Sequence, residues 1–189
     1  MQTICVYCGS SSGNDPAYMQ AAKSVGRFFA AADISLVYGG GHVGLMGIVA
    51  DACLASGGQV IGVITRSLMD REVGHWGLNE LVITETMHER KAIMAMRADG
   101  FIVLPGGIGT MDELFEIWTW RQLGLHQKPI GLLNINGFFD PLLLMTTRMT
   151  DSKFLKAVHR DLLIVESQIE TLIRRMKDHT SCNDTKWQS

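Results

Sequence analysis

The chain has 189 residues, of which 47% are apolar and 19% are charged, a composition typical of one globular domain and unlike that of disordered or fibrous proteins. Its net charge of −2 and isoelectric point near 6.3 lack the positive charge by which nucleic acids or anionic membranes are bound. No apolar run approaches the roughly 18 residues of a spanning helix, and the start MQTICVYC lacks the basic region of a secretory signal. We therefore expect a cytoplasmic protein that binds neither nucleic acid nor a membrane.

Strand and helix patterns alternate along the chain. The apolar segment 2–8 predicts a strand, and Asp15 followed by Pro16 marks the start of a helix over 16–32. Further strands are predicted at 34–38, 59–64, 80–85, 101–104, 129–134 and 162–165, and further helices at 45–56, 87–98, 111–123, 138–149 and 168–177. The stretch 65–79 is predicted to have less regular secondary structure. We expect a single domain over 1–179, followed by a polar tail at 180–189 that is expected to be disordered.

Short apolar strands separated by helices predict an α/β fold of three layers, in which a mostly parallel sheet is flanked by helices on both faces. In such sheets ligands bind beyond the carboxyl ends of the strands, where the strand order reverses. The loops that follow predicted strands, at 9–12, 39–44, 65–79, 86–91 and 105–110, are therefore the candidates for a functional site.

The loop 39–44 has the glycine spacing of dinucleotide-binding proteins, because Gly39, Gly41 and Gly44 stand at G-x-G-x-x-G positions between a strand and a helix. With Gly40, they could let backbone N–H groups approach a phosphate at a helix N-terminus. An NAD site also needs an acidic residue about 20 positions further on. Arg66 stands there instead and could suit the 2′-phosphate of NADP. A tight turn without a ligand is the alternative.

A second glycine loop follows the strand predicted at 101–104. Pro105 fixes the backbone and has no N–H to donate, while Gly106, Gly107 and Gly109 allow a ligand to come close. This is no Walker loop, because no Gly-Lys-Ser/Thr follows. Two glycine loops at one sheet edge favour a mononucleotide or a sugar phosphate. The candidate phosphate-binding loop residues are Gly9, Ser10, Gly39, Gly40, Gly41, Gly44, Pro105 and Gly106.

Two T-x-x-E sequences have the spacing of a capping box, in which two side chains close the start of a helix. For Thr86 and Glu89, capping is a sufficient role. Thr110 is expected to cap the helix predicted at 111–123. Glu113 follows the glycine loop, however, and could reach the ribose of a substrate whose phosphate the loop holds.

Arg90 and Lys91 occupy the first turn of the helix predicted at 87–98. Cations there oppose the helix dipole by a few tenths of a kcal/mol. A phosphate or a developing negative charge opposite them would explain their position, since arginine can bind such a group with its bidentate fork. A solvated basic turn is the alternative.

Cys5 and Cys8 form a C-x-x-C, but they belong to a strand rather than to a helix N-terminus, where a thiolate would be stabilised. A redox pair is therefore not favoured. No second ligand pair for zinc is evident, and His42, His75 and His88 lack metal-ligand spacing. We expect no metal site and assign these histidines to loops and caps.

Four segments together closely resemble the LOG family of cytokinin riboside 5′-monophosphate phosphoribohydrolases, often labelled lysine decarboxylases. They are YGGGHVGLMG at 38–47, MHERK at 87–91, PGGIGTMDE at 105–113 and TWRQLGLHQKPIGLLN at 119–134. The similarity spans roughly residues 4–149. It implies a Rossmann-like homodimer that needs no cofactor and hydrolyses the N-glycosidic bond of a nucleoside 5′-monophosphate. The products would be an adenine-type base and ribose 5-phosphate.

Carried over by motif, the resemblance implies that Arg90 and Glu113 form the catalytic pair. Thr119 lies about 120° around the helix from Glu113 and would meet the substrate obliquely or across the dimer interface. Thr86 stands where many members of the family carry an acidic residue. The implied substrate-binding residues are Glu72, Arg90, Lys91, Gly107, Ile108, Gly109, Thr110, Met111, Asp112, Glu113 and Thr119.

These residue types suit the reaction that the resemblance implies. Cleavage of an N-glycosidic bond builds oxocarbenium character on the ribose, which a carboxylate such as Glu113 stabilises while it orients or deprotonates water. Arg90 would hold the phosphate or position Glu113. Lysine decarboxylation would instead need a Schiff-base lysine, and Lys91 has a phosphate-binding role available. A non-catalytic nucleotide-binding or sensing module and an NADP oxidoreductase remain as alternatives.

Overall fold

The computed structural model describes residues 1–72 and 74–178, and the tail predicted at 180–189 lies outside them. The strands are β1 (Thr3–Tyr7), β2 (Ser35–Tyr38), β3 (Val60–Thr65), β4 (Glu80–Thr84), β5 (Gly100–Val103), β6 (Ile130–Leu133) and β7 (Leu163–Glu166). The helices are α1 (Pro16–Ala31), α2 (Gly44–Ala55), α3 (Arg66–Glu72), α4 (Met87–Arg97), α5 (Ile108–Gln122), α6 (Asp140–Asp151), α7 (Ala157–Arg160) and α8 (Ile169–Lys177), with a 3-10 turn η1 (Ile135–Gly137).

The strands form one seven-stranded sheet in the order β4-β3-β2-β1-β5-β6-β7. Each neighbouring pair is parallel, and Cys5 of β1 lies opposite Val37 of β2 on one side and Phe101 of β5 on the other. The chain builds outward from β1 to β4 and then returns to add β5 on the far side of β1. The strand order therefore reverses between β1 and β5, which is where ligands bind in sheets of this kind.

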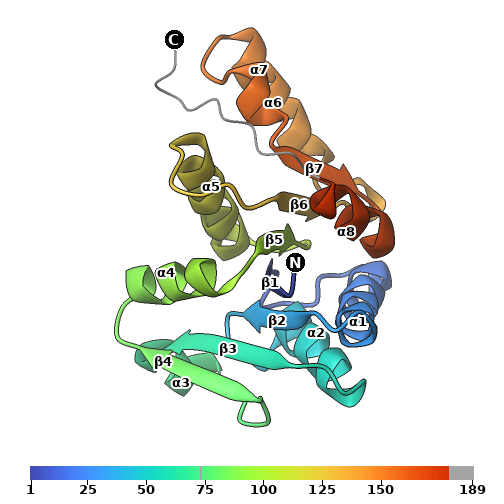
Figure 1. The fold of residues 1–189 in the computed structure, drawn as a ribbon, viewed down its shortest axis with the longest axis vertical. Coiled ribbons are helices and arrows are strands. Elements are labelled where there is room, and N and C mark those ends of the chain that lie inside the picture. Colours follow the sequence, from blue (N-terminus) through green and yellow to red (C-terminus); the bar gives the residue numbers. More distant parts are fainter. Residues whose placement is uncertain (73, 179–189) are drawn as a thin grey trace.

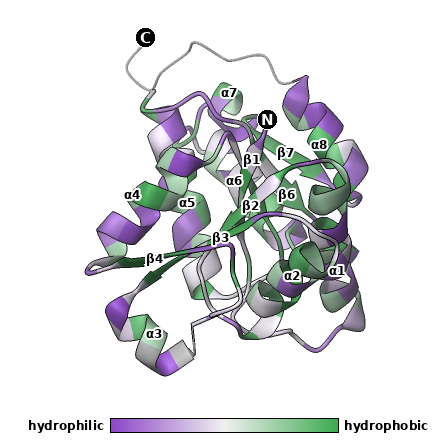
Figure 2. Ribbon diagram, turned by 60° about the horizontal axis from the view of Figure 1, so that its bottom comes forward, coloured by the Kyte–Doolittle hydropathy of each residue, from purple (hydrophilic) through white to green (hydrophobic). Residues whose placement is uncertain are grey.

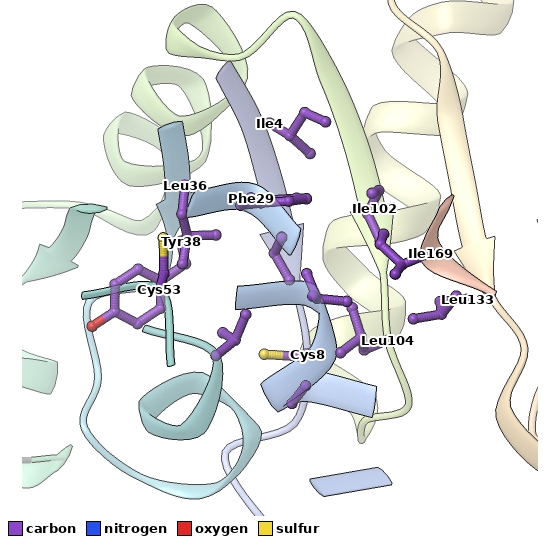
Figure 3. Close-up of a cluster of buried hydrophobic side chains, with 14 of the residues drawn as sticks. Ile4, Cys8, Phe29, Leu36, Tyr38, Cys53, Ile102, Leu104, Leu133 and Ile169 are labelled. Atoms are coloured by element: carbon purple, nitrogen blue, oxygen red, sulfur yellow. The ribbon is translucent and has the colours of Figure 1, made fainter. Parts of the chain in front are cut away.

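Helices cover both faces of the sheet, which confirms the predicted Rossmann-like α/β class. Figure 1 shows α4 and α5 on one side and α1, α2 and α8 on the other. Successive strand residues point to opposite faces, so Ile4 and Val6 join the core under α1, α2 and α8 while Cys5 and Tyr7 join the core under α4 and α5. Figure 3 shows part of the first core, where Phe29 of α1 lies among strand side chains.

Hydropathy follows this layering. Figure 2 shows apolar strands between helices whose outer faces are polar. None of the helices in the described part of the chain has both the length and the apolarity to cross a membrane.

Some helices begin at other residues than predicted, because local hydrogen bonds determine where a helix starts. Asp15 caps α1 as predicted, because its side chain accepts the N–H of Ala17 at 2.8 Å. The stretch predicted to be irregular contains α3. There the hydroxyl of Thr65 accepts the N–H of Leu68 at 3.3 Å, one of the backbone donors at a helix start that have no partner within the helix. Helix α5 begins at Ile108 rather than at Met111, since Gly107 is extended and acts as its N-cap.

Candidate active site

Two loops meet at the carboxyl ends of β1 and β5. The N–H of Gly9 donates to the carbonyl of Pro105 at 3.1 Å, and the N–H of Leu45, at the start of α2, donates to the carbonyl of Gly9 at 3.0 Å. A Cβ on Gly9 would lie 3.2 Å from the Cα of Gly106. Gly44 has a φ of +58°, and a Cβ there would overlap the backbone of Ser10. These glycines are therefore required for the loops to approach each other.

A cavity of about 240 Å³ opens beside this junction. Its wall combines the glycine loop, the start of α5 and side chains from α2, α3 and α4. The lining residues are Cys8, Ser10, Met46, Leu68, Met87, Arg90, Gly107, Ile108, Gly109, Thr110, Asp112 and Glu113. The residues implied as a catalytic pair, Arg90 and Glu113, therefore share one cavity with the glycine loop.

The Arg90 side chain is held from three directions. Its Nη1 donates to Glu113 Oε1 at 3.0 Å, and its Nε donates to the carbonyl of Val63 at 2.9 Å. Its Nη2 donates to the carbonyl of Gly39 at 3.4 Å, and a Cβ on Gly39 would overlap this guanidinium. The Arg90 residue is only 6% exposed. Each guanidinium nitrogen thus has a protein acceptor, and one of these acceptors is the Glu113 carboxylate.

Glu113 is a nearly buried carboxyl group, with 12% of its side chain exposed. Burial raises the pKa of Glu113 above its ordinary value, because the charged form loses solvation. The adjacent Arg90 charge and hydrogen bond lower this pKa and oppose the effect of burial. A carboxyl with a raised pKa on a cavity wall is a candidate for proton exchange with a substrate or a water.

Lys91 is also buried, and it lies behind the cavity rather than in its wall. Its Nζ contacts Asp112 Oδ2 at 3.1 Å and Glu116 Oε1 at 3.0 Å. Burial lowers the pKa of Lys91, but the hydrogen bonds to Glu116 and Asp112 outweigh it and the net shift is upward. This is the opposite of the depressed pKa that a Schiff-base lysine needs. Arg90 and Lys91 are ion-paired side chains, so the alternative of a solvated basic turn is wrong.

Gly107 and Gly109 differ from the packed glycines of the same junction. A Cβ added to either of them would meet nothing within 4 Å, and neither has a positive φ. Both are exposed, and both line the cavity. The fold therefore does not require glycine at these positions, whereas close approach of a ligand to the backbone would.

The two T-x-x-E sequences have different roles. Thr86 caps α4 as predicted: its hydroxyl accepts the N–H of Glu89 at 3.1 Å, and the Glu89 carboxylate accepts the N–H of Glu85 at 3.0 Å. The predicted cap at Thr110 is wrong. Thr110 lies within α5 and is buried against Gly106, because the helix begins two residues earlier at Ile108.

A second cavity, also of about 240 Å³, lies beside the first and shares Ser10 and Gly107 with it. Its remaining lining is largely apolar and includes Tyr18, Leu45 and Phe138. Gly9, Pro105 and Gly106 line this second cavity only. The glycine loop therefore separates two neighbouring hollows at the switch point.

Several predicted site residues lie elsewhere. Thr119 is exposed on α5 and Met111 packs against the core, and neither lines these two cavities. Glu72 ends α3, and its side chain lies outside what the structure describes. Residues 39–41 are buried and line neither cavity, and Gly39 lies against the Arg90 guanidinium. Arg66, the residue considered for an NADP phosphate, is exposed and pairs with Glu85 at 3.0 Å.

Sequence reasoning missed the apolar wall of the first cavity. Met46, Leu68 and Met87 come from three different helices, and no spacing in the sequence connects them. Met87 belongs to the MHERK motif, which implied no role for it. Cys8 also lines this cavity, but burial raises the pKa of both Cys5 and Cys8 well above the ordinary value, which opposes thiolate chemistry.

Known proteins resemble this chain in sequence over most of its length. The family described as "Possible lysine decarboxylase" matches residues 46–176. The chain is 46% identical over 177 residues to the probable cytokinin riboside 5′-monophosphate phosphoribohydrolase LOGL1 of Oryza sativa subsp. japonica, covering 94% of this chain and 79% of that protein. It is 44% identical over 176 residues to the cytokinin riboside 5′-monophosphate phosphoribohydrolase LOG7 of Arabidopsis thaliana, covering 93% of this chain and 81% of that protein.

Solved structures share the fold at lower identity. The X-ray structure of TM1055 matches with a TM-score of 0.71 at 22% identity, over 95% of this chain and 100% of that chain. The Moco carrier protein of Chlamydomonas reinhardtii matches with a TM-score of 0.70 at 19% identity, over 93% of this chain and 95% of that chain. The sequence relatives, together with the family match, show that this chain belongs to the LOG family of phosphoribohydrolases, which are N-glycosyl hydrolases.

Proposed function

We propose that the protein hydrolyses the N-glycosidic bond of adenine-type nucleoside 5′-monophosphates, including cytokinin-type ones, and releases the free base and ribose 5-phosphate. The observation that carries this proposal is the buried Glu113 carboxylate, held by Arg90 in a cavity rimmed by an exposed glycine loop. The plant relatives are named as enzymes that act on cytokinin riboside 5′-monophosphates.

The phosphate would bind where Gly107 and Gly109 leave the backbone open at the start of α5. The first N–H groups of a helix have no partner within the helix, and the helix dipole favours an anion there. Ser10, which is exposed on the facing loop and lines the same cavity, offers a hydroxyl to the same group. Neither Arg90 nor Lys91 is needed for phosphate binding in this arrangement, since both have carboxylate partners.

Glu113 lies one turn further along α5 than Gly109, so it would face the ribose of a nucleotide whose phosphate lies at the helix start. As the bond between C1′ and the base nitrogen breaks, its electron pair leaves with the base and positive charge develops on the ribose. The Glu113 carboxylate stabilises that charge and takes a proton from the attacking water, whose oxygen forms the new bond to C1′. The departing base gains a proton from the solvent.

Arg90 would act through Glu113. Its bonds to the carbonyls of Val63, within β3, and Gly39, directly after β2, fix the guanidinium, and the guanidinium in turn fixes one carboxylate oxygen. The apolar side chains of Met46, Leu68 and Met87 would contact the base, since thioethers and aliphatic groups pack well on a flat aromatic ring.

We also propose a homodimer formed through α4 and α5. Met96 on α4 is 71% exposed and Ile108 on α5 is 90% exposed, so both helices offer large apolar side chains that a second copy could cover. Ile108, Phe115 and Thr119 lie within about 40° of one another around α5, on a face that a second copy could cover. Thr119 would then lie at the interface rather than in its own cavity.

Product analysis tests the proposed reaction. The protein is incubated with AMP and with an isopentenyl-type AMP, and the free base and ribose 5-phosphate are measured by chromatography. Glu113→Gln should abolish release of the base while nucleotide binding by calorimetry persists. Glu89→Gln is the matched control, because Glu89 has the same spacing but only caps α4, and it should retain activity.

Other outcomes of these measurements would favour a different function or a different catalytic residue. Binding of nucleotides without any release of base, in the wild type, would identify a non-catalytic nucleotide-binding module. Full activity in Glu113→Gln would remove this residue from the mechanism. Tight binding of NADPH in a fluorescence titration would favour the oxidoreductase, although Arg66 pairs with Glu85 in the structure.

A further inference from the structure

Three side chains that are distant from one another in the sequence meet on the α2 side of the 39–44 loop. His42 belongs to the loop, Asp51 to α2, and His75 to the segment that follows α3. His75 Nε2 lies 2.8 Å from Asp51 Oδ1, and His42 Nε2 lies 3.3 Å from Asp51 Oδ2. No pattern in the sequence connects the two histidines, and only the tertiary structure brings the centroids of their rings to 4.3 Å from each other.

The three groups have the composition and spacing of a metal site. One ligand atom from each lies within 4.8 Å of the other two. Zinc binds imidazole nitrogen and carboxylate oxygen at about 2.0–2.2 Å, so neighbouring ligand atoms of a tetrahedral site lie roughly 3.3 Å apart. His42 Nε2 lies at this separation from Asp51 Oδ2, and His75 Nε2 lies 2.8 Å from the other carboxylate oxygen, Oδ1. Two imidazoles and one carboxylate suit zinc and neighbouring divalent transition metals, whereas copper(I) prefers thiolate and thioether ligands.

We propose that His42, Asp51 and His75 form a binding site for a divalent transition metal of the zinc class, with one coordination position left for water. Asp51 and His42 are exposed enough for an ion to enter, with 55% and 50% of their side chains accessible, while His75 is buried behind them. This cluster lines neither cavity at the switch point, so the site is separate from the proposed chemistry.

The hydrogen bonds show what metal binding would change. The N–H of Gly77 donates to His75 Nδ1 at 3.3 Å, so His75 Nε2 carries the ring proton and donates to Asp51. Metal binding at Nε2 moves that proton to Nδ1 and removes the acceptor of Gly77. Gly77 is exposed, so water can take over this bond at small cost.

The ion would stabilise the contact between two loops. The backbone already joins them, because the N–H of His75 donates to the carbonyl of Gly40 at 3.0 Å and Gly41 pairs with Gly74 in an isolated antiparallel bridge. The metal would add a link from the segment after α3 to α2. It would thereby brace the 39–44 loop, whose Gly39 carbonyl accepts from Arg90.

The test uses the full chain without an affinity tag, after removal of metals with a chelator. Zn²⁺ binding is measured by calorimetry, Co²⁺ binding by visible absorption, and thermal unfolding with and without Zn²⁺. We expect one ion per chain, a rise in Tm that a chelator reverses, and a Co²⁺ spectrum without a thiolate charge-transfer band. That band would appear if a cysteine thiolate bound the ion, so its absence distinguishes the proposed site from binding by cysteine.

His42→Ala and Asp51→Asn should each weaken metal binding by more than about 100-fold, since loss of a supporting contact alone costs about 10- to 100-fold. Both positions are exposed, so the apo variants should unfold near the wild-type temperature. His88→Ala is the matched control, because His88 is an exposed histidine on α4, and it should bind as the wild type does. No binding by the wild type, equal binding by His42→Ala, or a thiolate band would each overturn the proposal.

Discussion

At the residue scale, the interaction between Arg90 and Glu113 explains more of the site than any other contact. Sequence similarity selected both residues but left open whether Arg90 holds a phosphate or positions the glutamate. The structure favours positioning, because the carbonyls of Val63 and Gly39 and the Glu113 carboxylate accept from the guanidinium. Those carbonyls lie within β3 and directly after β2, and no motif in the sequence connects them with Arg90.

The raised pKa of Glu113 predicts the acidic limb of the pH profile. In the proposed reaction the carboxylate must be ionised to stabilise the ribose and accept a proton, so kcat/KM should fall as the pH drops through the pKa of Glu113. Because burial raises this pKa, the fall should occur at a higher pH than the value of about 4.3 typical of an exposed glutamate. The measurement is kcat/KM for AMP between pH 4 and 9, with Glu89→Gln as a control whose profile should match the wild type.

The raised pKa of Glu113 also means that ionisation of this carboxyl lowers the stability of the folded protein. A carboxyl whose pKa is raised by folding destabilises the folded state once it ionises. This cost is absent below the pKa of the unfolded chain and is complete above the pKa of the folded state.

In the pH profile of activity, a fall of kcat/KM at or below the pH at which an exposed glutamate titrates would show that Glu113 is not the group that controls activity.

At the element scale, hydrophobic periodicity predicted the seven strands and most helices, since both depend on local sequence. Periodicity failed where a tertiary contact or a local hydrogen bond determines whether a helix forms and where it begins. Helix α5 begins early because Gly107 is extended, and α3 forms in a stretch predicted to be irregular because Thr65 accepts the N–H of Leu68. The sequence also could not distinguish glycines that pack from glycines that leave the backbone open.

That distinction predicts different effects for two glycine-to-alanine changes. Gly109→Ala should leave the fold as stable as the wild type, because its Cβ meets nothing within 4 Å. It should raise KM by about tenfold or more, since a hydrogen bond to a charged group contributes about 1.5–3 kcal/mol. Gly44→Ala should instead unfold more easily, because a φ of +58° costs about 1–2 kcal/mol and the Cβ overlaps Ser10.

Chemical denaturation and steady-state kinetics measure these two effects separately. If Gly109→Ala binds the nucleotide as well as the wild type does, the phosphate does not approach the backbone at the start of α5. If Gly44→Ala retains wild-type stability, the loops after β1 and β2 are not in close contact.

At the scale of the whole molecule, the strand order brings the site together. Gly9 and Pro105 follow β1 and β5, which are separated in the chain by β2, β3 and β4 and the helices between them. They nevertheless share a hydrogen bond of 3.1 Å, because β1 and β5 are neighbours in the sheet. Alternating strands and helices predict a parallel sheet but do not specify which strands are adjacent. The prediction that residues 1–179 form a single domain stays a prediction.

The proposed homodimer can be tested by its mass in solution. Light scattering should give twice the chain mass of 20.8 kDa for the wild type. Phe115→Asp should shift the protein to the monomer, because a charge on this face of α5 would have to lose its solvation at the interface. Phe154→Asp is the matched control, since Phe154 is 87% exposed in the connection between α6 and α7 and should leave the dimer intact.

A wild-type protein that remains monomeric at micromolar concentration would exclude the dimer. If both variants behave as the wild type does, the interface does not include α5.

The sequence by itself determined the fold class, the family and the residues around Glu113, because apolar periodicity and contiguous motifs are local properties of the chain. Only the tertiary structure decided what each residue contacts. It paired Arg90 with Glu113, placed Thr110 inside α5, left Gly107 and Gly109 open, and brought His42 and His75 together on Asp51. These outcomes depend on which strands are neighbours and on how closely loops approach one another, and contacts between distant segments set both.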